Sequence, residues 1–269
     1  YANSLGIDTV ITDHHQPKGK RPNAVAVIDM HQSDCPSKYK MLSGVGVAFK
    51  LVMALEGENC DVSSLLDNYS DLLCIGTVGD IVELKSENRV FVKRGLVNIQ
   101  ESDRAGINAL IETAGIAGKK ITSGNVSFTL VPRINAVGRL GFSGKSVSLL
   151  LTDDENEAMS IAKQLNEDNN ERKEIEKNIL MKIDEMVKAN PHITNDRVLV
   201  IDGEGWHQGV IGIVAAKVKE FFGKPTVIIS RDGEEAKGSG RSVEGFSLCD
   251  AVFACSDLLI HCGGDPFGG

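Results

Sequence analysis

The sequence predicts a two-lobed α/β protein, with a parallel sheet in the larger first lobe, a smaller α/β second lobe and a long helix joining them. Three observations lead to this prediction. An apolar, β-branched run at residues 7–12 ends abruptly in polar side chains, which is typical of a buried parallel strand. A strongly polar segment at 152–188 carries a narrow apolar line. A second strand, glycine-rich turn and helix follow at 197–222.

The composition is that of an ordinary soluble globular protein, with 42% hydrophobic and 25% charged residues among 269. No run of about 18 apolar residues occurs, so no membrane span is predicted. The six cysteines are scattered without a CxxC pair, which favours a reducing, cytoplasmic setting. A formal net charge of −8 argues against a generic polyanion binder. A local basic groove stays open, because Arg133, Arg139 and Lys145 have no acid between them.

Asp13, His14 and His15 follow the first predicted strand directly. In open α/β sheets the chemistry takes place at the carboxyl ends of the strands. One carboxylate and two imidazoles in a row suit a divalent transition metal better than magnesium alone. The tripeptide by itself leaves a satisfied polar turn as an equal alternative, because short motifs have many false positives.

The next segments predict a short strand and several helices. Residues 24–28 predict the strand, and a helix from Ser43 ends at Gly57, with apolar residues spaced by four. A further helix at 63–78 ends just before Asp80. The helix dipole prefers cations after its last turn, so a metal ion would account for a carboxylate there. Residues 87–115 predict two short helices.

The stretch PRINAVGRLG at 132–141 predicts a break in regular structure at Pro132. Arg133 and Arg139 bracket this stretch, and guanidinium groups bind phosphates bidentately. A solvated basic loop is the alternative interpretation.

A long helix is predicted from a cap at Thr152 and Asp153 to about Lys188, and Pro191 ends it. Roughly 36 residues at 1.5 Å each make about 54 Å, longer than one domain needs, so we interpret it as a strut between domains. Beyond it we expect strands at 197–202, 225–230 and 236–243 and helices at 210–222 and 247–260. The ending HCGGDPFGG is typical of a loop.

Seven motifs in this order resemble those of the DHH phosphoesterases and, within them, the RecJ-type single-strand-specific exonucleases. They are TDHH at 12–15, SGVGVAFKL at 43–51, TVGDIVEL at 77–84, PRINAVGRLG at 132–141, WHQGVIGIVAAK at 206–217, GSGRS at 238–242 and the terminal glycine loop. The resemblance spans essentially the whole chain. PRINAVGR together with GSGRS is the part that is specific to RecJ.

The resemblance implies a catalytic DHH domain at 1–150, a connecting helix at 151–191 and a DHHA1-type substrate-binding domain at 192–269. It implies a metal-dependent 5′→3′ exonuclease that hydrolyses phosphodiester bonds of single-stranded DNA in repair and recombination. Two manganese ions, or magnesium in their place, would be held by Asp13, His14 and Asp80. Asp13 would alternatively fix the tautomer of a neighbouring histidine. His15 would face the scissile phosphate, so that His15 and Asp13 are the catalytic candidates.

The same resemblance assigns contacts with the substrate. Ser239 and Arg241 match positions that hold a terminal 5′ phosphate, and the two glycines of GSGRS would let backbone amides approach it. Arg133 and Arg139 would contact backbone phosphates nearer the cleavage point. His207 would contact a phosphate or the other lobe, with a packed surface Trp-His pair as the alternative.

Two departures from the family pattern limit these expectations. An acid pair of DxD type and a later single aspartate are expected before Tyr1, so we predict that this chain alone binds manganese weakly and cleaves nothing. Asp265 stands where the glycine loop of the family usually carries a histidine, and a carboxylate would repel a phosphate. We do not expect the given residues to contain the oligonucleotide-binding domain that RecJ enzymes commonly carry.

Two other functions stay open at this point. One is a DHH-family phosphodiesterase that acts on short oligoribonucleotides or small nucleotides, which the long helix and PRINAVGR disfavour. The other is a catalytically inactive DHH subunit that binds DNA within a replication assembly, which the intact DHH and Asp80 disfavour. We expect a monomer that binds single-stranded DNA, with a single-strand-binding protein or a helicase as candidate partners.

Overall fold

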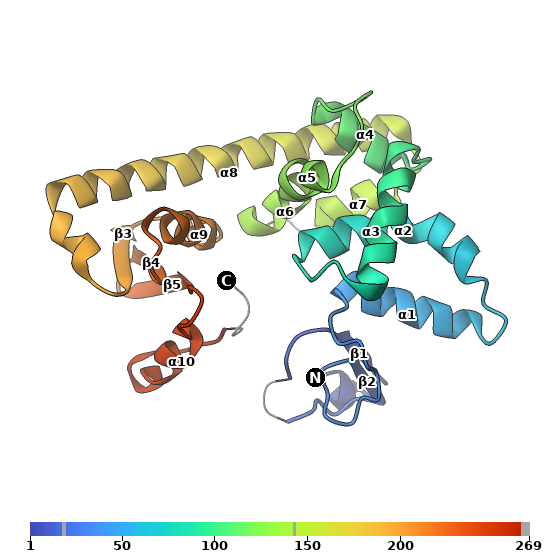
Figure 1. Ribbon diagram of the computed structural model, residues 1–269, viewed down its shortest axis with the longest axis horizontal. Coiled ribbons are helices and arrows are strands. Elements are labelled where there is room, and N and C mark those ends of the chain that lie inside the picture. The colour runs from blue at the N-terminus through green and yellow to red at the C-terminus, as the bar shows by residue number, and fades with distance from the viewer. Residues whose placement is uncertain (18–19, 142–143, 265–269) are drawn as a thin grey trace. The chain divides into compact units, whose positions relative to one another are not determined.

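A computed structural model describes residues 1–17, 20–141 and 144–264 of the protein. The residues divide into two compact units. Unit 1 comprises Tyr1–Val137 and Ser143–Asn166, and unit 2 comprises Gly138–Phe142 and Glu167–Gly269. The long helix α8 (Glu155–Ala189) therefore contributes its first part to unit 1 and the rest to unit 2 (Figure 1). Within the described residues, no helix is both long and apolar enough to cross a membrane.

Unit 1 combines a small parallel sheet with many helices. Its strands β1 (Val10–Asp13) and β2 (Ala26–Asp29) run parallel, with Asp13 opposite Asp29. Its other elements are η1 (Ala2–Leu5), α1 (Gly44–Glu56), α2 (Val62–Gly79), α3 (Ser86–Gln100), α4 (Ala105–Thr113), α5 (Ser123–Asn125), the π-helical η2 (Val126–Leu130), α6 (Val131–Leu140), whose end belongs to unit 2, and α7 (Gly144–Leu151).

The helices of unit 1 begin and end largely where the sequence predicts. Ser43 precedes α1 and Gly57 follows it, and α2 ends at Gly79 with Asp80 as its C-cap. An apolar core joins α2, α3, α4, η2, α6, α7 and the start of α8, and a second cluster packs α1 against α2 and α3. These helices give α2 a fixed position, and its carboxyl end carries Asp80.

The prediction that β1 is buried is wrong, although the strand is parallel as expected. Along β1 exposed and half-buried side chains alternate, and Val10 is 56% exposed. Among the described residues β1 pairs only with β2 and packs mainly on α1. A strand with one neighbour and one covering helix keeps much of its apolar surface in water.

Pro132 does not break regular structure, contrary to the prediction from the sequence. It is the second residue of α6, and the chain is helical from Ser123 to Leu140. Proline has no N–H for an intrahelical hydrogen bond, so inside a helical run it needs a local change in the hydrogen-bond pattern. The π-helical turn just before it changes the hydrogen-bond pattern at that point. PRINAVGR therefore lies on a helix rather than in a loop.

Unit 2 is a smaller α/β unit around a mixed sheet. In the sheet order β3-β4-β5, β3 pairs parallel with β4, and β5 pairs antiparallel with β4. The elements are the second part of α8, η3 (Pro191–Asn195), β3 (Leu199–Glu204), α9 (Ile211–Phe222), β4 (Thr226–Asp232), β5 (Glu235–Arg241), α10 (Leu248–Phe253) and η4 (Ser256–Leu258). The apolar core joins α8, β3, β4 and α9. These two units confirm the α/β class.

Two predicted helix boundaries in this region are wrong. The N-terminus of α8 is capped by Asp154, whose Oδ1 accepts the N–H groups of Asn156 and Glu157, rather than by Thr152 and Asp153. The helix expected at 247–260 ends at Phe253. The residues at 258–260 are exposed, so packing does not stabilise a longer helix.

Candidate metal centre and phosphate-binding site

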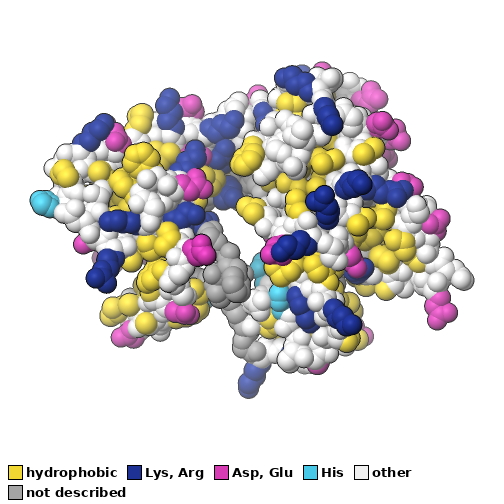
Figure 2. Space-filling model, in the orientation of Figure 1, with side chains coloured by type: hydrophobic (Ala, Val, Ile, Leu, Met, Phe, Trp, Pro, Cys, Tyr) yellow, Lys and Arg dark blue, Asp and Glu magenta, His cyan; other side chains and the backbone are white. Residues whose placement is uncertain are grey.

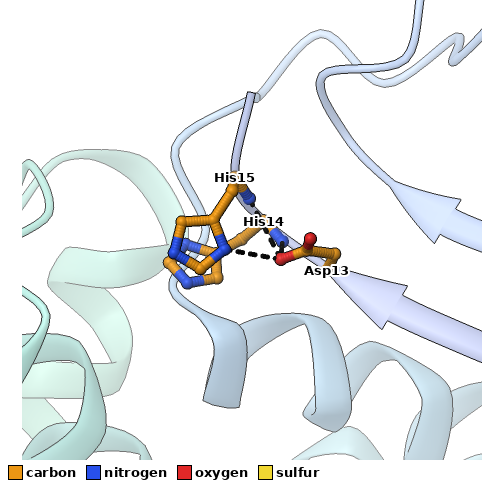
Figure 3. A group of neighbouring side chains, drawn as sticks. All are labelled: Asp13, His14 and His15. Atoms are coloured by element: carbon orange, nitrogen blue, oxygen red, sulfur yellow. Dashed lines mark hydrogen bonds and ion pairs between the residues drawn. The ribbon is translucent and has the colours of Figure 1, made fainter. Parts of the chain in front are cut away.

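The Asp13, His14 and His15 side chains gather at the carboxyl end of β1. The Oδ1 of Asp13 accepts the backbone N–H of His14 at 2.7 Å and that of His15 at 3.2 Å. The same oxygen lies 2.7 Å from His15 Nδ1. Figure 3 shows the two imidazole rings beside each other, with their centroids 4.2 Å apart. Asp13, His14 and His15 therefore form a hydrogen-bonded polar turn and, at the same time, a cluster of possible metal ligands.

The electrostatics of this turn favour an ionised Asp13. Burial raises the pKa of its carboxyl, but the hydrogen bond with His15 and the N–H groups of His14 and His15 outweigh burial. The pKa therefore lies below its ordinary value of 3.8. One ligand atom from each of the three residues lies within 4.8 Å of the others.

Asp80 approaches His14 from the end of α2. Its Oδ2 lies 3.3 Å from His14 Nδ1. Ile81, the next residue, has a φ of 59°, which is unusual for a β-branched side chain. Backbone strain of this kind concentrates at functional sites, and it turns the chain directly after the carboxylate.

The wall around His14 is built from small residues on two helices. Gly44 begins α1, and a Cβ there would lie 3.3 Å from His14 Cδ2. On α2, a Cβ at Gly76 would lie 2.6 Å from Val45 Cγ1. A buried contact of 3.1 Å between Ser43 Oγ and Thr77 Oγ1 joins the two helices. The SGVG and TVGD motifs are therefore two halves of one packed interface that presents His14 and Asp80.

His14 and Asp80 line one pocket of about 360 Å³. Ile134 and Asn135 of α6 line it too, so PRINAVGR contributes to the histidine pocket within unit 1. The sequence analysis did not identify Asn135. The feature that could have indicated it is its position between the two arginines of that motif. Asn135 is exposed, and its amide can donate to a phosphate oxygen.

The donor set fits a divalent transition ion. Asp13 and Asp80 offer carboxylates, and His14 and His15 offer imidazoles. Imidazole suits transition metals, and carboxylate suits manganese and magnesium. The hydrogen bond from His15 Nδ1 to Asp13 leaves Nε2 as the ring atom free to bind.

Ser239 and Arg241, in unit 2, lie on β5 against the start of α9. A Cβ at Gly212, the second residue of α9, would lie 2.9 Å from Ser239 Oγ and 3.2 Å from Arg241 Nη2. Arg241 Nη1 donates to Gly240 O at 2.7 Å. Val210, the N-cap of α9, provides no side-chain cap. A hydroxyl, a guanidinium and a helix N-terminus therefore converge, which is the chemistry of an anion site.

Arg139 belongs to the same unit and adds positive charge. Its Nη1 lies 3.5 Å from Gly209 O. Burial lowers the pKa of Arg139, and Arg172 lowers it further. Burial also lowers the pKa of Arg241, and Arg139 lowers it further. The two guanidinium groups are close enough to repel each other, and a phosphate between them would relieve this repulsion.

His207 lies beside Arg139 in a pocket of about 450 Å³. Its Nδ1 accepts the N–H of Gly209 at 3.1 Å. Trp206 is only 5% exposed and belongs to the core, where Gly203 leaves room for its ring. Trp206 and His207 are thus not a surface pair: the tryptophan is buried and the histidine lines a pocket.

Arg133 belongs to unit 1, whereas the residues of the anion site belong to unit 2. Its Nη1 donates to Thr129 O at 2.7 Å and its Nε donates to Asn166 Oδ1 at 3.1 Å. Burial lowers the pKa of its guanidinium. Two of its donor atoms are thus used inside unit 1, where they join α6 to η2 and α8.

The structure describes the terminal glycine loop only in part. Asp265 lies outside the described residues. In GSGRS, a Cβ at Gly240 would lie 2.6 Å from Leu248 Cδ2, so this glycine makes room for α10.

Residues 1–77 match the family described as "DHH family, N-terminal domain", and residues 195–268 match the "DHHA1 domain". The chain contains a DHH N-terminal domain and a DHHA1 domain. This DHH chain is 38% identical over 267 residues, 98% of its length, to the single-stranded-DNA-specific exonuclease RecJ of Bacillus subtilis. It covers 33% of that protein.

Solved structures of RecJ from Thermus thermophilus are also similar to the DHH chain. The crystal structure with Mn²⁺ superposes with a TM-score of 0.83 at 33% sequence identity and covers 98% of this chain and 38% of that one. The structure with Mg²⁺ gives a TM-score of 0.72, also at 33% identity, over 86% of this chain and 35% of that one. The DHH chain spans between a third and a half of the length of the curated relatives that it matches.

Proposed function

We propose that this DHH chain is the metal-binding and 5′-phosphate-binding part of an exonuclease that hydrolyses single-stranded DNA from its 5′ end. One observation carries the proposal: His14 and Asp80, far apart in the sequence, meet at 3.3 Å in one pocket beside Asp13 and His15. The similar proteins carry the name single-stranded-DNA-specific exonuclease, and solved structures of RecJ hold Mn²⁺ or Mg²⁺. These names support manganese as the metal and a DNA strand as the substrate.

The proposed roles of the pocket residues follow from their chemistry. His14 and Asp80 would hold the metal, and Asp13 would ligate it or orient His15. When bound, a pair of divalent ions activates water and offsets the charge that develops on the phosphate. His15, which is exposed beside them, would face the scissile phosphate. Asn135 would orient that phosphate by donating from its amide.

The proposed roles in unit 2 concern position rather than bond cleavage. Ser239, Arg241 and Arg139 would hold a terminal 5′ phosphate, with His207 as a further contact. Phosphate contacts fix the register of a strand without reading its sequence. We retain the division into a catalytic domain at 1–150, a connecting helix at 151–191 and a DHHA1-type domain at 192–269 as part of this proposal.

The first experiment measures Mn²⁺ binding to the 269-residue chain. We expect binding to be weak, because two ions need more ligands than two carboxylates and two imidazoles provide. His14→Ala should weaken binding by more than about tenfold. The control, His192→Ala, removes an exposed histidine on η3 and should change nothing. Equal affinity of both variants would contradict the proposed metal site.

The second experiment measures which nucleic acid the chain prefers to bind. Binding of 5′-phosphorylated single-stranded DNA is compared with binding of the 5′-hydroxyl strand, of duplex DNA and of dinucleotides. We expect the phosphorylated single strand to bind best and to stay intact in the presence of Mn²⁺. Equal or better binding of dinucleotides would favour the alternative phosphodiesterase for small nucleotides. Manganese-dependent digestion that His14→Ala abolishes would overturn the expected inactivity of this chain.

A further inference from the structure

Helix α8 carries a buried polar segment in the part that belongs to unit 2. Its buried residues there are Asn169, Arg172, Glu176, Ile179 and Ile183, spaced alternately by three and four. The last two enter the apolar core, but the first three are polar. Arg172 is 8% exposed and Glu176 is 4% exposed. Burying a charge is costly unless it is paired, so packing alone does not explain this segment.

Glu176 is the acceptor at the centre of the segment. Its Oε2 accepts from Arg172 Nη1 at 2.7 Å. Its Oε1 pairs with Lys217 Nζ of α9. Arg172 Nη2 also donates to Asn169 Oδ1 at 3.2 Å. One buried carboxylate therefore holds two cations that come from two helices.

The segment has more donors than acceptors. Arg172 Nε and Asn169 Nδ2 are buried and have no hydrogen-bond partner among the described residues. Glu176 also acts on Arg139, raising the pKa that burial and Arg172 lower. Figure 2 shows Lys and Arg side chains gathered between α8 and α9. The internal network thus acts electrostatically on Arg139 of the anion site, and two of its buried donors have no acceptor among the described residues.

We propose that Glu176 is the internal counter-ion of the phosphate-binding arginines and limits their affinity for a 5′ phosphate. The carboxylate and an incoming phosphate compete for the same positive charge. Glu176 therefore neutralises the cations when no strand is bound and favours release of a bound strand. This inference rests on the proposed 5′-phosphate site. It adds Glu176 as a residue that acts on the site through its charge, without contacting the phosphate.

The size of the effect follows from Coulomb's law. A unit charge within about 10 Å, in an effective dielectric of about 20, changes the affinity for an anion by about tenfold. Glu176→Gln removes this charge and leaves the side chain almost unchanged in size. Asn169→Asp adds a negative charge beside Arg172 and also leaves the side chain almost unchanged in size. The two substitutions should act in opposite directions.

The test measures binding of a single-stranded oligonucleotide with a 5′ phosphate and of the same strand with a 5′ hydroxyl, without metal, together with thermal unfolding. Glu176→Gln should lower Tm, because Arg172 loses its ionic partner. It should also raise the preference for the 5′ phosphate by about tenfold. Asn169→Asp should lower this preference by about tenfold. Glu174→Gln removes an exposed charge from the same helix and should change neither quantity.

The outcomes separate this inference from the function on which it rests. A lower Tm for Glu176→Gln with an unchanged preference means a structural role only and overturns the inference. If Glu176→Gln does not fold, Asn169→Asp decides, and an unchanged or increased preference overturns it. If the wild-type chain shows no preference for the 5′ phosphate, the proposed phosphate site fails and this inference fails with it.

Discussion

A Gly212→Ala substitution should separate phosphate binding from folding. The added Cβ would lie 2.9 Å from Ser239 Oγ and 3.2 Å from Arg241 Nη2. The first distance is too short for a real contact, and both neighbours are the ends of side chains. We therefore expect alanine to displace the hydroxyl and the guanidinium, and to leave α9 in place.

The expected magnitude follows from the groups that move. Loss of one hydrogen bond to a charged group costs about 1.5–3 kcal/mol, which is about 10- to 100-fold in affinity for the 5′ phosphate. Alanine is a better helix former than glycine by up to about 1 kcal/mol, so the free energy of unfolding should stay the same or rise. Weaker binding with undiminished stability is the signature of the anion site.

Fluorescence anisotropy with 5′-phosphorylated and 5′-hydroxyl single strands, in parallel with thermal unfolding, measures both effects. The control is Gly144→Ala in α7, where an added Cβ meets no heavy atom within 4 Å among the described residues. An equal loss of affinity for both strands would refute the assignment of this site to the terminal phosphate. Unchanged affinity for both would refute the geometry on which the site rests.

Three further predictions concern unit 1. Asp80→Asn should weaken Mn²⁺ binding by at least about 10- to 100-fold, which is the loss expected when even a residue that only hydrogen-bonds a metal ligand is removed. Calorimetry measures this loss, with Glu83→Gln as the control. Burial raises the pKa of Cys74 to about 12, so at pH 8 only about one thiol in ten thousand is ionised. Mass spectrometry after alkylation of the folded protein should therefore find the exposed Cys255 modified and Cys74 intact, and equal modification would contradict the packing of α2. In Gly95→Ala the Cβ would lie 2.0 Å from Ser70 O, so urea unfolding should show a loss of about 1–3 kcal/mol, whereas an unchanged midpoint would contradict the close crossing of α2 and α3.

The sequence predicts those parts of the fold that have local causes. Gly223 ends α9 in the left-handed conformation, with φ of 66°, and glycine there is a local signal. Pro132 is also a local signal, but its meaning depends on whether the preceding turn is α-helical or π-helical, and the residue types do not report this. The exposure of β1 depends on how many strands pair with it, which is a tertiary property.

The candidate site divides in the same way. Asp13, His14 and His15 are adjacent in the chain, so a strand end is enough to gather them. Asp80 was placed beside them by the family resemblance and by its unfavourable position at a helix end. Asn135 and Gly212 were missed, because their importance lies in the side chains of other elements that approach them.

Helix α8 shows how such a feature can be read from the sequence after all. The apolar line along this helix is interrupted: one part ends at Leu165 and the next buried apolar residue is Ile179. Between them the buried polar residues Asn169, Arg172 and Glu176 continue the same spacing of three and four. If only apolar side chains are counted, the polar segment between the two apolar parts is interpreted as an exposed, solvated strut. Periodicity of position, rather than of hydrophobicity, indicates instead that the helix stays packed along its length. A charged residue at such a position needs an ionic partner, and Glu176 has two: the buried Arg172 on its own helix and the exposed Lys217 on α9.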